Sequence, residues 1–163
     1  MDVINTHKRI INLPKAEVAT LLETLSTKKD KVWPKDNWPP IRFKNGLKVG
    51  EVGGHGIIRY SVYEFIPEKL IVFKFLKPKG FKGIHKFEIV AINKSSTEVK
   101  HSIIMKTTSM MATLKWVIAI KWLHNALIEN AFDTIENNYL EVKKHTKWNC
   151  WVSLWRFILT KIG

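Results

Sequence analysis

The longest regular pattern of apolar residues runs from Met110 to about Lys144, a stretch without Gly or Pro. Its apolar residues recur at intervals of three and four, which places them on one face of a helix of roughly 50 Å at about 1.5 Å per residue. His124 falls in the middle of that face, where an imidazole needs a partner. The expected buried face comprises Met110, Leu114, Val117, Ile120, Leu127, Ile128, Ala131, Ile135, Tyr139 and Val142. The expected solvent face comprises Lys115, Glu129, Asn130, Asp133, Glu136, Asn137, Glu141 and Lys143.

The preceding part of the chain changes to the patterns of strands and turns. A first strand is predicted over 3–11, followed by a helix that Pro14 opens and whose apolar residues are Val18, Leu21, Leu22 and Leu25. A short helix near 29–33 and an irregular Trp- and Pro-containing loop to residue 40 follow. Strands are then predicted over 56–66, 70–76, 84–92 and 97–107, and their short connections make them antiparallel neighbours. The order predicts an α+β fold in which the long helix crosses a curved sheet.

The last residues, from His145 to Gly163, form a second amphipathic pattern that is rich in tryptophan. One helical face carries Trp148, Trp151, Val152, Trp155, Leu159 and Ile162. A short turn at 145–147 would fold this helix back onto the body, where it would cover Trp116 and Trp122, and this is the favoured interpretation. The alternative is a position in a membrane interface, which suits Trp and basic residues. We therefore expect one domain over 1–145 and a Trp-rich extension over 146–163.

Charge and cysteine content narrow the classes of function. The 163 residues include 27 Lys and Arg against 14 Asp and Glu, a net charge of +13 that favours anionic partners. The lysines are dispersed and no RNA-binding signature occurs, so nucleic acid is not the expected partner. The single cysteine, Cys150, excludes an intrachain disulfide and fits a reducing compartment. With no signal-peptide or membrane-spanning pattern, we expect a cytoplasmic protein that can be peripheral to an anionic membrane through 146–163.

Several histidines lie in the strands and in the long helix. Residues two apart in a strand share a face, which groups His85 with Phe87, and His101 with Ile103. If their strand is regular, His55, Ile57 and Arg59 also share a face. Three interpretations remain open: separately hydrogen-bonded rings, the polar end of an apolar ligand pocket, and a metal or acid–base site. No HExxH or H-x-x-x-H spacing supports a metal, and no G-x-S-x-G or P-loop sequence supports a nucleophile or a phosphate-binding cofactor.

Together with this order of elements, certain segments resemble the START-like, or SRPBCC, superfamily, which includes polyketide cyclase-like and pathogenesis-related ligand-binding proteins. The resemblance covers about Val3 to Lys144 and rests on the segments GHGIIRY (54–60), EFIP (64–67) and GIHKF (83–87), with His124 in the last helix. It implies a helix-grip fold with a deep apolar cavity between the sheet and the long helix, in which different members hold lipids, sterols or polyketides. Some members catalyse and many only bind, and the superfamily has no single catalytic signature, so the resemblance assigns no catalytic residue.

The predicted function is the binding of a hydrophobic small molecule or lipid in that cavity, without catalysis, metal or cofactor. The alternatives are a cyclase- or hydrolase-like enzyme that uses cavity histidines, and a basic protein that acts at a membrane surface through 146–163. The residues expected to contact the ligand are His55, Ile57, Arg59, Phe73, Phe75, His85, Phe87, His101, Ile103, Ile120, His124 and Leu127.

Overall fold

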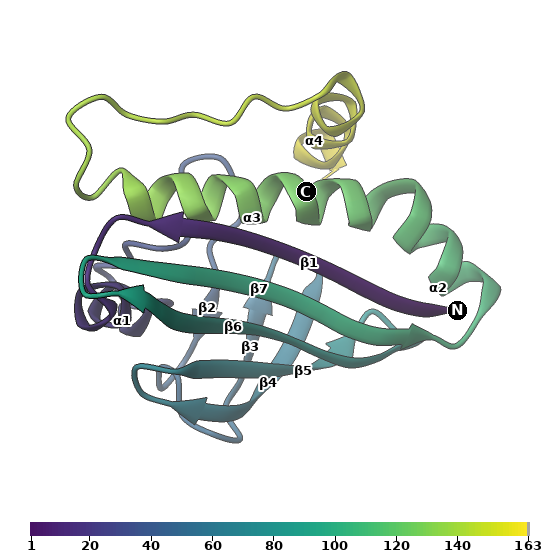
Figure 1. The fold of residues 1–163 in the computed structure, drawn as a ribbon. Coiled ribbons are helices and arrows are strands. Elements are labelled where there is room, and N and C mark those ends of the chain that lie inside the picture. Colours follow the sequence, from purple (N-terminus) through teal and green to yellow (C-terminus); the bar gives the residue numbers. More distant parts are fainter. Residues whose placement is uncertain (163) are drawn as a thin grey trace.

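The computed structural model describes residues 1–162 and has the predicted α+β class (Figure 1). A seven-stranded antiparallel sheet has the order β1-β7-β6-β5-β4-β3-β2, so the first strand pairs with the last. The helices lie on one side of this curved sheet. The strands are β1 (Asp2–Ile11), β2 (Arg42–Phe43), β3 (Val52–His55), β4 (Ile58–Ile66), β5 (Leu70–Lys77), β6 (Phe81–Asn93) and β7 (Ser96–Thr107). The strand predicted over 56–66 corresponds to β4, which begins two residues later, and a tight turn joins it to the short strand β3 before it.

The long helix crosses the sheet in three consecutive segments: α2 (Met110–Lys115), the π-helix η1 (Trp116–Ile120) and α3 (Lys121–Glu136). It ends at Glu136 and not near Lys144, because the Asn137 side chain pairs with both backbone groups of Lys144 and turns the chain back. The predicted register is wrong in α2 and at the start of the π segment, where Met110, Leu114 and Val117 are exposed and Ala112 and Trp116 are buried. A π turn holds an additional residue and so rotates the preceding turns relative to α3.

The polar face of α3 is also more buried than its sequence indicates. Asn130, Asp133 and Glu136 are all buried, although their spacing predicts a solvent face. Arg9 of β1 covers this face from the sheet, and the chain that follows α3 covers it from the other side. Helical periodicity therefore identified the apolar face here, but it could not show that long-range partners cover the polar one.

The N-terminal helix α1 (Lys15–Glu23) forms after Pro14, as predicted. The short helix expected near 29–33 is absent, and that prediction is wrong. Instead, the Asp30 carboxylate accepts hydrogen bonds from the backbone N–H groups of Ser26, Val32 and Trp33, which gives a compact series of turns. The turns place Trp33 in the core and lead to the loop that contains Trp38.

The inner side of the sheet is filled at one end and hollow at the other. Near α1, the core is continuous and includes Ile71, Phe87, Ile89 and Val99. Toward the opposite end, a smaller cluster forms around Phe81, Ile103, Met105, Ala112 and Trp116. The two clusters leave space between them under the long helix, and this space holds the candidate site.

After α3 the chain runs back along the helix to α4 (Cys150–Ile162), which lies against the outer side of α3 (Figure 1). Val152 is buried in the core, the Trp148 ring packs edge-on against Trp38 at 5.4 Å, and Trp151 Nε1 donates to the carbonyl of Ile118, 2.7 Å away. The docking position differs from the predicted one: Trp116 is buried beneath the long helix against Phe81, and Trp122 remains partly exposed. The side chain of Ile162 lies outside the described residues.

Over the described residues 1–162, no helix combines the length and the apolar character that crossing a membrane requires.

Candidate ligand-binding site

A cavity of about 630 Å³ lies between the long helix and the hollow end of the sheet. The strands contribute one apolar wall and the helix contributes the other, so the π segment η1 lies directly over the space. The apolar residues of these walls are Ile58, Phe75, Phe81, Ile103, Trp116, Ile120, Leu123 and Leu127. Volumes of ~300–1,000 Å³ with mainly apolar walls are typical of small-molecule sites.

The mouth of the cavity lies where the loop at 35–39, the turn between β3 and β4, and α4 meet. Ile57 at this turn is 73% exposed, although it borders the cavity. From α4, Arg156, Leu159 and Thr160 complete the rim. Arg156 Nη2 donates to the carbonyl of Asn37 at 2.6 Å, and its guanidinium lies 4.7 Å from the centre of the Trp38 ring. The C-terminal extension is therefore part of the site, which its amphipathic pattern alone did not indicate.

Most of the residues expected to contact a ligand border this cavity: His55, Ile57, Phe75, His85, Ile103, Ile120, His124 and Leu127. The exceptions are Arg59, Phe73, Phe87 and His101. Arg59 is exposed, and its Nη1 donates to the carbonyls of Gly56 and Ile58. Phe73 lies behind the stacked ring of His85, at 4.8 Å, and His101 lies behind His85 and His124. Phe87 belongs to the filled end of the core.

Several polar side-chain atoms of residues that line the cavity have no hydrogen-bond partner. Among residues 1–162, the Tyr60 hydroxyl, His85 Nε2 and both ring nitrogens of His124 are buried and unpaired; the Asn125 side chain makes only a weak contact with His124. His85 Nδ1 contacts His101 Nε2 at 3.3 Å, and the Tyr60 ring packs edge-on against His85 at 4.6 Å. An unpaired buried polar group costs about 1–3 kcal/mol, so a cluster of them indicates a place for a polar ligand atom. Tyr60 was missed by sequence reasoning, although it lies in the GHGIIRY segment.

Burial keeps the cavity histidines neutral. It lowers the pKa of His85 to about 3, with a further contribution from the charge of His55. The pKa of His55, at the partly buried end near the mouth, falls to about 4 because of desolvation and the neighbouring Arg59. Desolvation, followed by repulsion from other histidines, also lowers the pKa values of His101 and His124, and burial raises the pKa of Tyr60. At neutral pH the site thus presents uncharged donors and acceptors in an apolar space.

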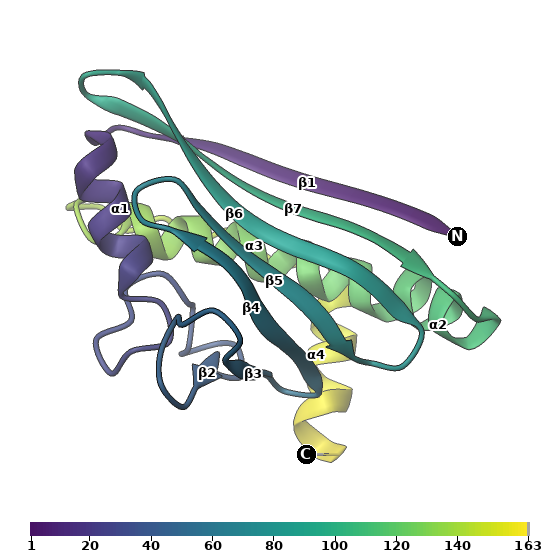
Figure 2. The ribbon, with the colours of Figure 1, turned by 90° about the horizontal axis from the view of Figure 1, so that it is seen from below.

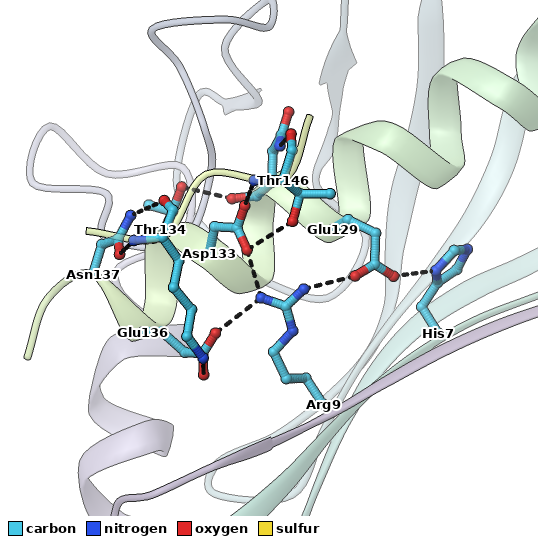
Figure 3. A network of polar contacts seen from close by, with 10 residues as sticks. His7, Arg9, Glu129, Asp133, Thr134, Glu136, Asn137 and Thr146 are labelled. Atoms are coloured by element: carbon cyan, nitrogen blue, oxygen red, sulfur yellow. Dashed lines mark hydrogen bonds and ion pairs between the residues drawn. The ribbon is translucent and has the colours of Figure 1, made fainter. Parts of the chain in front are cut away.

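A second group of buried polar residues lies farther along α3, outside the cavity, and is fully paired (Figure 3). Arg9 donates to Asp133 at 2.6 Å, to Glu136 at 2.9 Å and to Glu129 at 2.7 Å. Asp133 also accepts from the backbone N–H of Thr146 at 2.6 Å, and this bond attaches the returning chain to α3. Burial alone would raise the pKa of Asp133, but its bonds to Arg9 and Thr146 hold that pKa below the usual value. This network of ion pairs and hydrogen bonds holds β1, α3 and the C-terminal extension together.

Neither of these groups resembles a metal centre. Within residues 1–162, no three or more His, Cys, Asp or Glu side chains are arranged so that they could hold a metal ion. The cavity histidines contact one another or aromatic rings. The nearby carboxylate of Glu129 is already paired with Arg9 and His7.

Comparison with known proteins identifies the fold but no sequence family. No protein-family model matches the chain, and no curated protein sequence matches it. Among solved structures, norcoclaurine synthase from Thalictrum flavum in complex with dopamine and hydroxybenzaldehyde is similar, with a TM-score of 0.66, 12% identity, and coverage of 89% of this chain and 90% of that one. A solution structure of a protein from Thermobifida fusca has a TM-score of 0.64 and 16% identity over 88% of this chain and 99% of that one.

A conserved protein of unknown function from Enterococcus faecalis is also similar, with a TM-score of 0.60, 12% identity, and coverage of 99% of this chain and 84% of that one. At such low identities the likeness concerns the fold alone. It confirms the helix-grip arrangement that the resemblance of the sequence implied.

Proposed function

We propose that this protein binds a hydrophobic small molecule or lipid in the cavity under the long helix. The observation that carries the proposal is the combination of a roughly 630 Å³ apolar space with buried, unpaired polar atoms of Tyr60, His85 and His124. An apolar ligand that fills the space is removed from water, which is favourable by about 25 cal/mol for each Å² of apolar surface buried. A polar group on the same ligand relieves the cost of the unpaired atoms.

The chemistry of the lining favours an uncharged polar group on the ligand. The imidazoles of His85 and His55 are neutral at physiological pH, because their pKa values lie near 3 and 4. Neutral imidazole and phenol groups can each donate and accept, which suits a hydroxyl or a carbonyl group. A carboxylate deep in the cavity would lack a cation to offset its desolvation, because the cations among the described lining residues, Lys35 and Arg156, belong to the loop and the helix that form the mouth. Norcoclaurine synthase, which has this fold, accommodates dopamine and hydroxybenzaldehyde, both small aromatic molecules with hydroxyl groups.

Acid–base catalysis is the second candidate, because the imidazoles of His55, His85 and His124 do border one space. A general base at neutral pH works best with a pKa near 7. The pKa values of His85 and His55, about 3 and 4, make these rings weak bases, which favours hydrogen bonding to a ligand over proton transfer. Turnover of a bound hydroxyaryl or ketone compound, with loss of activity in His85→Leu, would decide for catalysis.

The most direct experiment is mass spectrometry of small molecules that copurify with the natively expressed protein. A matched pair of fluorescent probes, hydroxymethylpyrene and methylpyrene, then tests the site, since the two differ by one hydroxyl group. The substitution Ile120→Trp fills the cavity and should weaken both probes at least about tenfold. Ile4→Trp, at a position 81% exposed on β1, is the control and should change neither. Equal binding to wild type and Ile120→Trp would exclude the cavity as the binding site.

A further inference from the structure

The exposed side of α4 carries large apolar residues beside the mouth of the cavity. Its inner side, with Val152, faces the body, while Trp151, Leu154 and Phe157 on the outer side are 42%, 47% and 61% exposed. These residues follow one another at intervals of three and lie on one helical face. The bond from Trp151 to the carbonyl of Ile118 joins this face to η1, where Val117 and Ile118 are also exposed. We call this continuous surface of α4 and η1 the outer apolar surface.

The two chain segments that form the outer apolar surface carry charges of a single sign. No Asp or Glu occurs in 110–128 or in 142–163, whereas these stretches contain Lys115, Lys121, Lys143, Lys144, Lys147, Arg156 and Lys161. Within residues 1–162, Lys121, Lys147 and Lys161 form no ion pair, and all are exposed. The Lys161 ammonium lies 5.8 Å from the centre of the Phe157 ring, so basic and apolar groups alternate on the same surface.

From this surface we infer that the protein docks on anionic lipid bilayers through α4 and η1. Trp and Phe side chains gain by moving into the headgroup region, and each nearby Lys is attracted by the negative surface potential of the membrane. An apolar face without acidic groups, bordered by unpaired lysines, matches an anionic bilayer better than it matches a protein surface of mixed charge. The inference concerns a surface outside the cavity and does not require that the cavity hold a ligand.

Docking in this way places the mouth of the cavity next to the bilayer. Leu159 and Thr160 of α4 form part of the rim, and exposed Ile57 lies across it on the turn between β3 and β4. In Figure 2 the C-terminal end of α4 reaches beyond the body near the ends of β3 and β4. A molecule dissolved in the leaflet that faces the protein would thus meet the mouth without crossing bulk water.

The chain offers its own position for a reporter, because Cys150 is its single cysteine, is exposed and begins α4. An environment-sensitive fluorophore on Cys150 should show a blue shift and about a fivefold rise in emission with phosphatidylcholine vesicles that contain about 30 mol% phosphatidylserine. Pure phosphatidylcholine vesicles should give little change, and salt raised from about 50 to about 300 mM should weaken the response. The control is the same label at the distant β6–β7 turn, in Cys150→Ser/Lys94→Cys, which should stay unchanged.

Two pairs of variants separate docking from general attraction. Leu154→Ser/Phe157→Ser should reduce cosedimentation with the anionic vesicles about tenfold, whereas Val90→Ser/Ile92→Ser, which removes similarly exposed apolar groups from β6, should not. Likewise Lys147→Glu/Lys161→Glu should weaken binding far more than Lys48→Glu/Lys94→Glu, which changes the net charge by the same amount. Equal losses within either pair would overturn the proposal. It also fails if the Leu154/Phe157 variant binds vesicles as wild type does but loses self-association or nucleic-acid binding.

Discussion

Two groups of buried polar residues lie between the sheet and the long helix, and they differ in how completely they are paired. Around Arg9, every carboxylate has a partner, and His7 at the edge of this network contacts Glu129 at 2.7 Å and Asn125 at 3.1 Å. The His7 and His124 rings are only 5.9 Å apart, yet His124 has no partner of good geometry. The paired group stabilises the fold. The unpaired group lowers stability, but it lies where a ligand can supply the missing hydrogen bonds.

The largest effect is expected from breaking the paired group. Arg9→Met leaves the carboxylates of Glu129, Asp133 and Glu136 without their shared cation, and should lower the free energy of unfolding by about 3–5 kcal/mol. The control is Lys8→Met on the same strand, where the exposed pair with Glu98 is worth under about 1 kcal/mol. Urea unfolding of both variants measures the difference. If both variants lose a similarly small amount of unfolding free energy, the network does not hold β1 and α3 together as described above.

The unpaired group should make stability depend on pH. The pKa of His85 is about 3 in the folded protein and about 6.5 when unfolded, so the unfolded chain binds more protons between these values. The contribution of the neutral His85 ring to the free energy of unfolding is complete above pH 6.5. It declines as pH falls toward 3, and about 2 kcal/mol is lost at pH 5. His85→Leu should remove this part of the dependence, while His145→Gln, at an exposed position, should keep it. If the free energy of unfolding of His85→Leu falls with decreasing pH as steeply as that of wild type, the His85 ring is not buried and neutral as described.

A smaller effect is expected at His124. Because both ring nitrogens are buried without a good partner, His124→Leu should fold with unchanged or slightly higher stability, by about 1 kcal/mol. The same variant should lose preference for hydroxymethylpyrene over methylpyrene. Thermal unfolding and the two probe affinities test this. A large loss of stability would instead place His124 in a structural hydrogen-bond network.

The sequence predicted the sheet and the order of elements well, because strand alternation and short turns are local signals. It predicted the long helix but misplaced its first turns, since nothing local marks a π segment at Trp116–Ile120. Partners distant in sequence account for the other differences. Arg9 buries Asp133 from 124 positions away, and Arg156 reaches Asn37 across 119. His85 and His124 were identified by the faces on which they lie. His55 was grouped with Arg59 on the assumption of a regular strand, but β3 ends at His55 and Arg59 is exposed; the rim formed by α4 also required the folded chain.

The claim that the unpaired group receives a polar ligand atom can be tested most directly by nitrogen NMR of the imidazole rings during probe titration. Hydroxymethylpyrene should shift the ring-nitrogen signals of His85 and His124 while leaving those of His7, which already has partners, nearly unchanged. Methylpyrene should fill the same cavity and reproduce only the smaller shifts caused by the pyrene ring. The account is contradicted if the two probes give identical shifts at His85 and His124, or if His7 responds as strongly as they do.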